Sequence, residues 1–82
     1  MKNNVDENQF KTSDLALATT ISLSFPVIAR DRATSPRVFF VFHRTPELDV
    51  LVERFWRGEI TVEPQAFANQ IKNLKTRIYS GE

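Results

Sequence analysis

The chain has one histidine and no cysteine among its 82 residues, which limits the chemistry its side chains can perform. His43 would have to anchor any histidine-based metal site or serine–histidine pair. Arg44 follows directly, and its positive charge disfavours a bound cation nearby. We therefore interpret His43 as a structural or exposed residue at the end of a strand. The lack of cysteine removes disulfides and thiolate catalysis.

A group of carboxylates lies in the middle of the chain: Glu47, Asp49, Glu53, Glu59 and Glu63. Asp49 and Glu53 are neighbours at i, i+4 on a helix, and Arg57 follows Glu53 at the same spacing. This pattern favours a solvated, ion-paired helix face over acid–base catalysis or Mg²⁺ binding. The two glycines are too few for a phosphate-binding loop. We expect no enzyme activity and no catalytic, cofactor-binding or metal-binding residue, and nothing indicates a small-molecule substrate.

The basic residues are better placed to contact a partner. Residues 25–44 carry a net charge of +3 from four arginines against one aspartate, residues 45–63 carry −3, and residues 64–82 carry +2. Lys72, Lys75 and Tyr79 form one row at i, i+3 and i+7. Guanidinium groups bind phosphates or acidic protein surfaces equally well. The candidate contact residues are Arg30, Arg32, Arg37, Arg44, Lys72, Lys75, Tyr79 and Trp56.

The longest uncharged segment, residues 15–29, argues against a membrane span. It is fifteen residues long and contains Pro26, whereas a membrane helix needs about 20 apolar residues. An acidic, amide-rich stretch precedes it, unlike the basic region of a signal peptide. We expect a cytoplasmic protein with a flexible segment at 1–10 and a single globular domain at 11–82.

Capping signals and periodicity predict the α+β class, in the order α-β-β-α-(β)-α. The helices are expected near 13–24, 46–57 and 64–79, and an antiparallel hairpin at about 26–31 and 37–43. Thr12 or Ser13 is the expected cap of the first helix, and Thr45 with Pro46 opens the second. Residues 59–63 are left open as a third strand.

The segment "RVFFVFH" at 37–43 concentrates three phenylalanines in four positions. An RNA-binding sheet would interleave such rings with glycine and expose them. Here glycine is absent, and Val38, Phe40 and Phe42 alternate with Phe39, Val41 and His43. A strand that is apolar on both faces is covered on both, by helices, by a second subunit or by one of each. We interpret the phenylalanines as core.

The chain resembles a family of small domains of unknown function that is found in bacteria, archaea and their phages. The resemblance covers roughly residues 10–79 and is carried by "KTSDLALA" at 11–18, "FVF" at 40–42, "WRGE" at 56–59 and "LK" at 74–75. It implies a phage or mobile-element setting and supports the fold, and it transfers no catalytic residue.

Two functional hypotheses remain. The leading one is a non-catalytic interaction module that binds a protein partner or itself as a homodimer, because the central strand has excess apolar surface and Trp56 and Tyr79 lie at helix edges. The alternative is weak, sequence-independent binding of nucleic acid by the hairpin arginines and last-helix lysines. About four phosphate contacts would then give a salt slope near −4.

Overall fold

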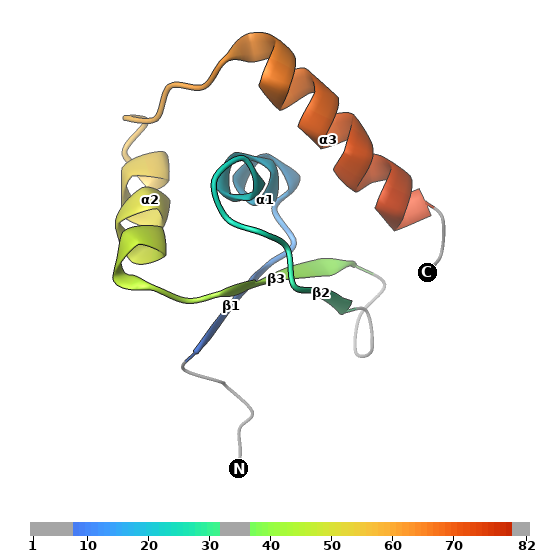
Figure 1. Cartoon of the computed structure of the whole chain (residues 1–82), viewed down its shortest axis with the longest axis horizontal. Coiled ribbons are helices and arrows are strands. Elements are labelled where there is room, and N and C mark those ends of the chain that lie inside the picture. The colour runs from blue at the N-terminus through green and yellow to red at the C-terminus, as the bar shows by residue number, and fades with distance from the viewer. Residues whose placement is uncertain (1–7, 32–36, 80–82) are drawn as a thin grey trace.

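The computed structural model describes residues 8–31 and 37–79, and it confirms the predicted α+β class (Figure 1). Three helices pack with a three-stranded antiparallel sheet. The elements in chain order are β1 (Gln9–Thr12), α1 (Leu15–Ser22), β2 (Ala29–Asp31), β3 (Phe39–His43), α2 (Pro46–Trp56) and α3 (Pro64–Tyr79). None of these helices is both long enough and apolar enough to cross a membrane.

The strand β3 is the centre of the sheet, whose order is β1-β3-β2. The predicted hairpin is confirmed as β2 paired with β3, with Arg30 opposite Phe40. On the other side β1 pairs with β3, with Phe10 opposite Phe42. Because both neighbours are antiparallel to β3, side chains of all three strands alternate in register between two faces.

The third strand comes from the N-terminal side of the chain, and residues 59–63 form no strand. Gln9 and Phe10, which the sequence placed in a flexible segment, belong to β1. The side chains of β1 alternate as in a half-buried strand: Phe10 and Thr12 face the helices, while Gln9 and Lys11 face away. Four residues with only two inward positions give too weak a pattern to stand out in a polar stretch.

Helix α1 is the central element of the helical layer and lies between α2 and α3 above the sheet (Figure 1). Its five consecutive residues from Leu17 to Ile21 are all buried, which requires neighbours on every side. Two of them are polar. The Thr19 and Thr20 hydroxyls donate to the carbonyl oxygens of Leu15 and Ala16, so neither hydroxyl is buried without a partner.

The core lies between the helices and one face of the sheet. Phe40 and Phe42 of β3 are essentially inaccessible, at 1% and 0% exposure. They pack with buried side chains from the three helices, namely Leu17 and Ile21 of α1, Leu48 of α2 and Leu74 of α3. The prediction that the phenylalanines are core is confirmed for Phe40 and Phe42, whereas Phe39 is half-buried on the opposite face of the sheet.

The boundaries of α2 and α3 follow the prediction, whereas α1 spans Leu15–Ser22 and is shorter by two residues at each end than the expected 13–24. The backbone N–H of Leu48 donates to Thr45 Oγ1 at 3.0 Å, Pro46 opens α2, and Gly58 follows its end with φ +72°. In α1 the cap is Asp14, whose carboxylate accepts from the N–H of Leu17 at 3.0 Å. The cap is therefore neither Thr12 nor Ser13, the two residues that the sequence predicted. Thr12 is the last residue of β1, and its hydroxyl oxygen accepts a hydrogen bond from the N–H of Asp14.

Helix α3 packs against α1 along the stripe predicted from the sequence. Leu74 is buried, Ile78 packs on the core, and Phe67 and Ile71 are half-buried. The Gln70 side chain donates to Ser22 Oγ at 3.0 Å and ties the two helices together. One side of α3 is thereby fixed, and its remaining surface faces solvent.

Candidate functional site

The hairpin arginines that the structure describes do not gather on one surface. The guanidinium of Arg30 lies on the helix side of β2, where its Nη1 donates to the carbonyl oxygen of Arg77 in α3 at 2.9 Å. Arg44 pairs instead with Asp49 at the start of α2, with 3.0 Å between Nε and Oδ1. Arg37 is exposed before β3, and Arg32 lies outside the described residues.

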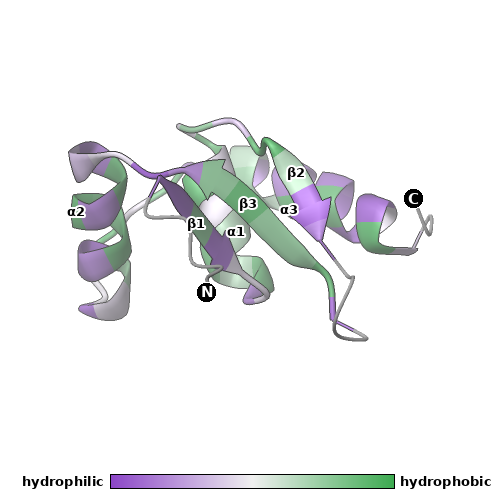
Figure 2. Ribbon diagram, turned by 90° about the horizontal axis from the view of Figure 1, so that it is seen from below, coloured by the Kyte–Doolittle hydropathy of each residue, from purple (hydrophilic) through white to green (hydrophobic). Residues whose placement is uncertain are grey.

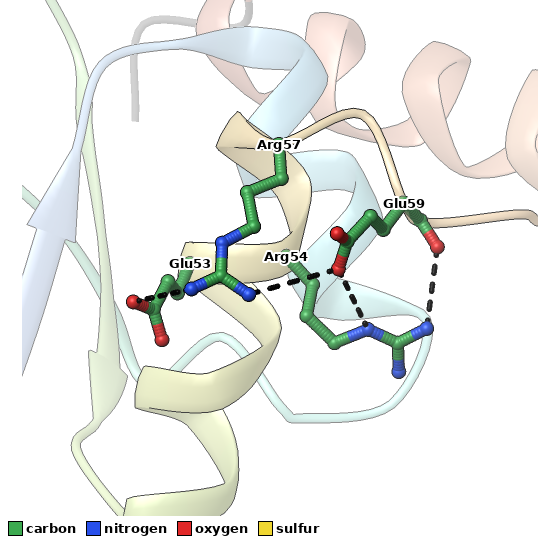
Figure 3. A network of polar contacts seen from close by, with 4 residues as sticks. All are labelled: Glu53, Arg54, Arg57 and Glu59. Atoms are coloured by element: carbon green, nitrogen blue, oxygen red, sulfur yellow. Dashed lines mark hydrogen bonds and ion pairs between the residues drawn. The ribbon is translucent and has the colours of Figure 1, made fainter.

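At the C-terminal end of α2 the charges compensate one another (Figure 3). Arg57 contacts Glu53 at 3.1 Å and Glu59 at 3.9 Å, and Arg54 contacts Glu59 at 3.8 Å. The predicted ion-paired face is confirmed. All four side chains are about half exposed or more, so solvent screens the pairs and each contributes ~0–1 kcal/mol to stability. The carboxylates of this network are partly neutralised and are poor candidates for acid–base chemistry.

The exposed side of α3 carries the row that the sequence singled out. Lys72, Lys75, Thr76 and Tyr79 line an open hollow of about 570 Å³ along this helix, and we call these four residues the α3 face. The helix has three basic residues and no acidic one. Within the described part of the chain, Lys72 and Lys75 form no ion pair, whereas Lys11, Arg44, Arg54 and Arg57 all do.

The two candidate aromatic residues are far apart in the fold, one on each outer helix. Trp56 is 64% exposed at the end of α2, where its ring meets Phe55 edge to face with 5.1 Å between centroids. Tyr79 is 81% exposed at the end of α3 and shares a surface with the two lysines. Of the eight candidates, the structure therefore groups Lys72, Lys75 and Tyr79, and places Arg30 behind the same helix end.

A metal-binding geometry finds no support among residues 8–31 and 37–79. No three His, Cys, Asp or Glu side chains there are grouped so that they could hold a metal ion. His43 is exposed at the end of β3, as expected, opposite Gln9 of β1. What the described surface offers chemically is ion pairing, stacking and apolar contact.

The sequence reading missed the arrangement on the outer sheet face, the side away from the helices, which comprises Gln9, Lys11, Ala29, Asp31, Phe39, Val41 and His43. Lys11 on one edge strand contacts Asp31 on the other at 3.1 Å, so their ion pair spans β3. Val41, between them, is only 3% exposed although it lies on the face away from the three described helices. Figure 2 shows β3 as an apolar band beside the hydrophilic β1. The alternation of polar and less polar residues in 9–12 was the sequence signal that could have predicted β1 and thus this face.

The fold and surface define a small α+β domain with a basic, acid-free outer helix. The family comparison agrees with the resemblance noted in the sequence: a model described as "Domain of unknown function (DUF5659)" matches residues 7–80. The chain belongs to this family. No match was found among curated proteins or among solved structures.

Proposed function

We propose that this domain is a non-catalytic interaction module that binds a larger anionic partner through the α3 face. The observation that carries the proposal is the contrast between the two ends of the molecule. Lys72 and Lys75 have no acidic partner among the described residues, whereas Arg54 and Arg57 at the end of α2 are bound to Glu53 and Glu59. An unpaired cation keeps its full attraction for an external anion, and a paired cation does not.

The arrangement of the elements adds to this contrast. Helices α2 and α3 flank α1 on opposite sides, so the compensated network and the α3 face lie at opposite ends of the molecule (Figure 1). A net charge of only +1 for the chain is then compatible with a locally positive surface. The α3 face also has Tyr79, an aromatic residue of the type enriched at binding surfaces.

Heparin-affinity chromatography tests the proposal with two variants that lose the same charge. The α3 variant is Lys72→Ala with Lys75→Ala, and the α2 control is Arg54→Ala with Arg57→Ala. The wild type and the α2 control should elute at similar salt, and the α3 variant should elute earlier. Equal shifts for both variants, or no retention of the wild type at low salt, would contradict the proposal. Circular dichroism of each variant controls for folding.

A second candidate, weak self-association through the outer sheet face, is favoured by the position of one ion pair. Lys11 and Asp31 lie on opposite edges of the sheet. A copy rotated about an axis parallel to β3 would place each Lys11 over the other chain's Asp31, with Phe39 and Val41 between the sheets. Three short strands bury less than the ~800 Å² per partner of a stable interface, so such a dimer would be weak.

Light scattering over a range of concentrations tests this dimer. Lys11→Asp should make the chain monomeric, and adding Asp31→Lys should restore the concentration dependence by reversing the pair. A wild type that remains monomeric at the highest soluble concentration would remove this candidate.

A further inference from the structure

The geometry of the α3 face indicates what kind of anion it fits. Residues three and four apart on a helix have Cβ atoms ~5–6 Å from each other, so Lys72, Lys75, Thr76 and Tyr79 are neighbours along two turns. Two ammonium groups therefore precede an aromatic ring on one continuous strip. The lining of the hollow is mostly apolar, as expected where lysine side chains expose their methylene stems next to an aromatic residue.

The exposed ring of Tyr79 distinguishes between three anionic partners: an acidic peptide, single-stranded nucleic acid and a nucleic-acid duplex. The residue is 81% exposed, which leaves its ring accessible to a ligand. An acidic peptide would use the lysines and has no planar group that must stack on the ring. Single-stranded nucleic acid offers both features in alternation, because phosphates carry the charge and unpaired bases stack on aromatic side chains. In a duplex the bases are already stacked on each other, and a surface tyrosine gains no ring contact.

We propose that the partner bound by the α3 face is single-stranded nucleic acid, with Lys72 and Lys75 contacting successive phosphates and Tyr79 stacking on a base. This inference rests on the proposed function, because it names the partner of the same surface. Thr76, between the lysines and the ring, supplies a hydroxyl near the backbone. Its Oγ1 donates to the carbonyl oxygen of Lys72 at 2.9 Å, so the hydroxyl is oriented and its oxygen can still accept.

The structure also sets the expected salt dependence. Arg30 and Arg44 have partners within the chain. The expected number of phosphate contacts therefore falls from four, as the sequence suggested, to two, made by Lys72 and Lys75. A single strand that contacts two cations gives a log–log salt slope of about −1.4. Between roughly 50 and 200 mM salt the affinity should therefore fall about sevenfold. Binding is expected to be weak and indifferent to sequence.

Fluorescence anisotropy with a labelled oligodeoxynucleotide of about 12 nucleotides, within the ~4–16 that such surfaces cover, tests the inference. The same sequence as a duplex and a labelled poly-glutamate are the competing probes. The single strand should bind more tightly than either. Tyr79→Ala should weaken it by about fivefold or more, and Tyr79→Phe, which keeps the ring, should not. The α3 variant should lose the salt dependence, and the α2 control should match the wild type.

The outcomes separate this inference from the proposed function. Retention on heparin that depends on the α3 lysines, without binding of the oligonucleotide, would overturn the nucleic-acid assignment and leave the α3 face as a binding surface. Equal or tighter binding of the duplex or of poly-glutamate would also overturn it, as would a Tyr79→Ala variant that binds like the wild type. If neither heparin nor any probe binds, both proposals are wrong.

Discussion

The Nη1 of Arg30 donates a hydrogen bond to the main-chain carbonyl oxygen of Arg77 at 2.9 Å, which joins β2 to the last turn of α3. The four last carbonyl groups of a helix have no partner within the helix, and a cation near them is favourable. The side chain thus closes the helix end that carries Tyr79. A residue that looked from the sequence like a partner contact has a structural role.

Replacing Arg30 by alanine should loosen the end of α3 and destabilise the fold by about 1 kcal/mol, since the bond is charge-assisted and partly solvated. Lys75→Ala is the matched control, because Lys75 is on the same helix and forms no ion pair with a described residue, and this variant should stay within ~0.5 kcal/mol of the wild type. Urea unfolding measures both. Hydrogen exchange should accelerate at residues 75–79 in the Arg30 variant, and unchanged exchange there would refute the tether.

Adjacent phenylalanines of β3 should differ sharply when truncated. Phe40→Ala should cost about 3–5 kcal/mol because its ring is 1% exposed in the core. Phe39→Ala should cost about 1–2 kcal/mol, since this ring is only half-buried on the outer sheet face. Denaturant titration compares the two, and Phe40→Leu replaces Phe40→Ala if the latter does not fold. Equal costs would contradict the assignment of the faces.

The start of α1 allows a direct comparison between the observed cap and a residue expected from the sequence. Asp14→Ala should destabilise the fold by about 1 kcal/mol because the N–H of Leu17 loses its acceptor. Ser13→Ala should have little effect. Thermal unfolding distinguishes them, and a larger loss for Ser13→Ala would place the cap where the sequence predicted it.

At Gly58 the cost of substitution should be purely conformational. Its φ is +72°, and a Cβ built there meets no atom within 4 Å. Gly58→Ala should therefore cost about 1 kcal/mol from the left-handed backbone alone. Gly58→Asn, which tolerates this region better, should cost less. A loss of several kcal/mol, measured by urea unfolding, would show that packing and not backbone conformation is at stake.

The features that could be predicted from the sequence are those with a strong local signal. The Thr45 side-chain cap and the prolines Pro46 and Pro64 set helix starts locally, and the alternation in residues 38–42 correctly placed Val38, Phe40 and Phe42 on one face, which the structure packs in the core. The strand β1 was not predicted, because its pairing with β3 joins residues 28 to 34 positions apart and leaves only a four-residue pattern in the local sequence.

The candidate site was predictable only where it lies on a single helix. Lys72, Lys75 and Tyr79 share a face because of helical spacing alone. The partners of Arg30 and Arg44 depend on tertiary packing, with Arg30 reaching a residue 47 positions away, and no sequence period encodes such contacts.

The most direct test of the α3 face is an NMR titration of the isotopically labelled domain with inorganic polyphosphate, a probe without bases. The amide signals of Lys72, Lys75, Thr76 and Tyr79 should shift most, and those of α2 should stay in place. Shifts concentrated on α2 or on Phe39, Val41 and His43, or no shifts at low salt, would contradict the account.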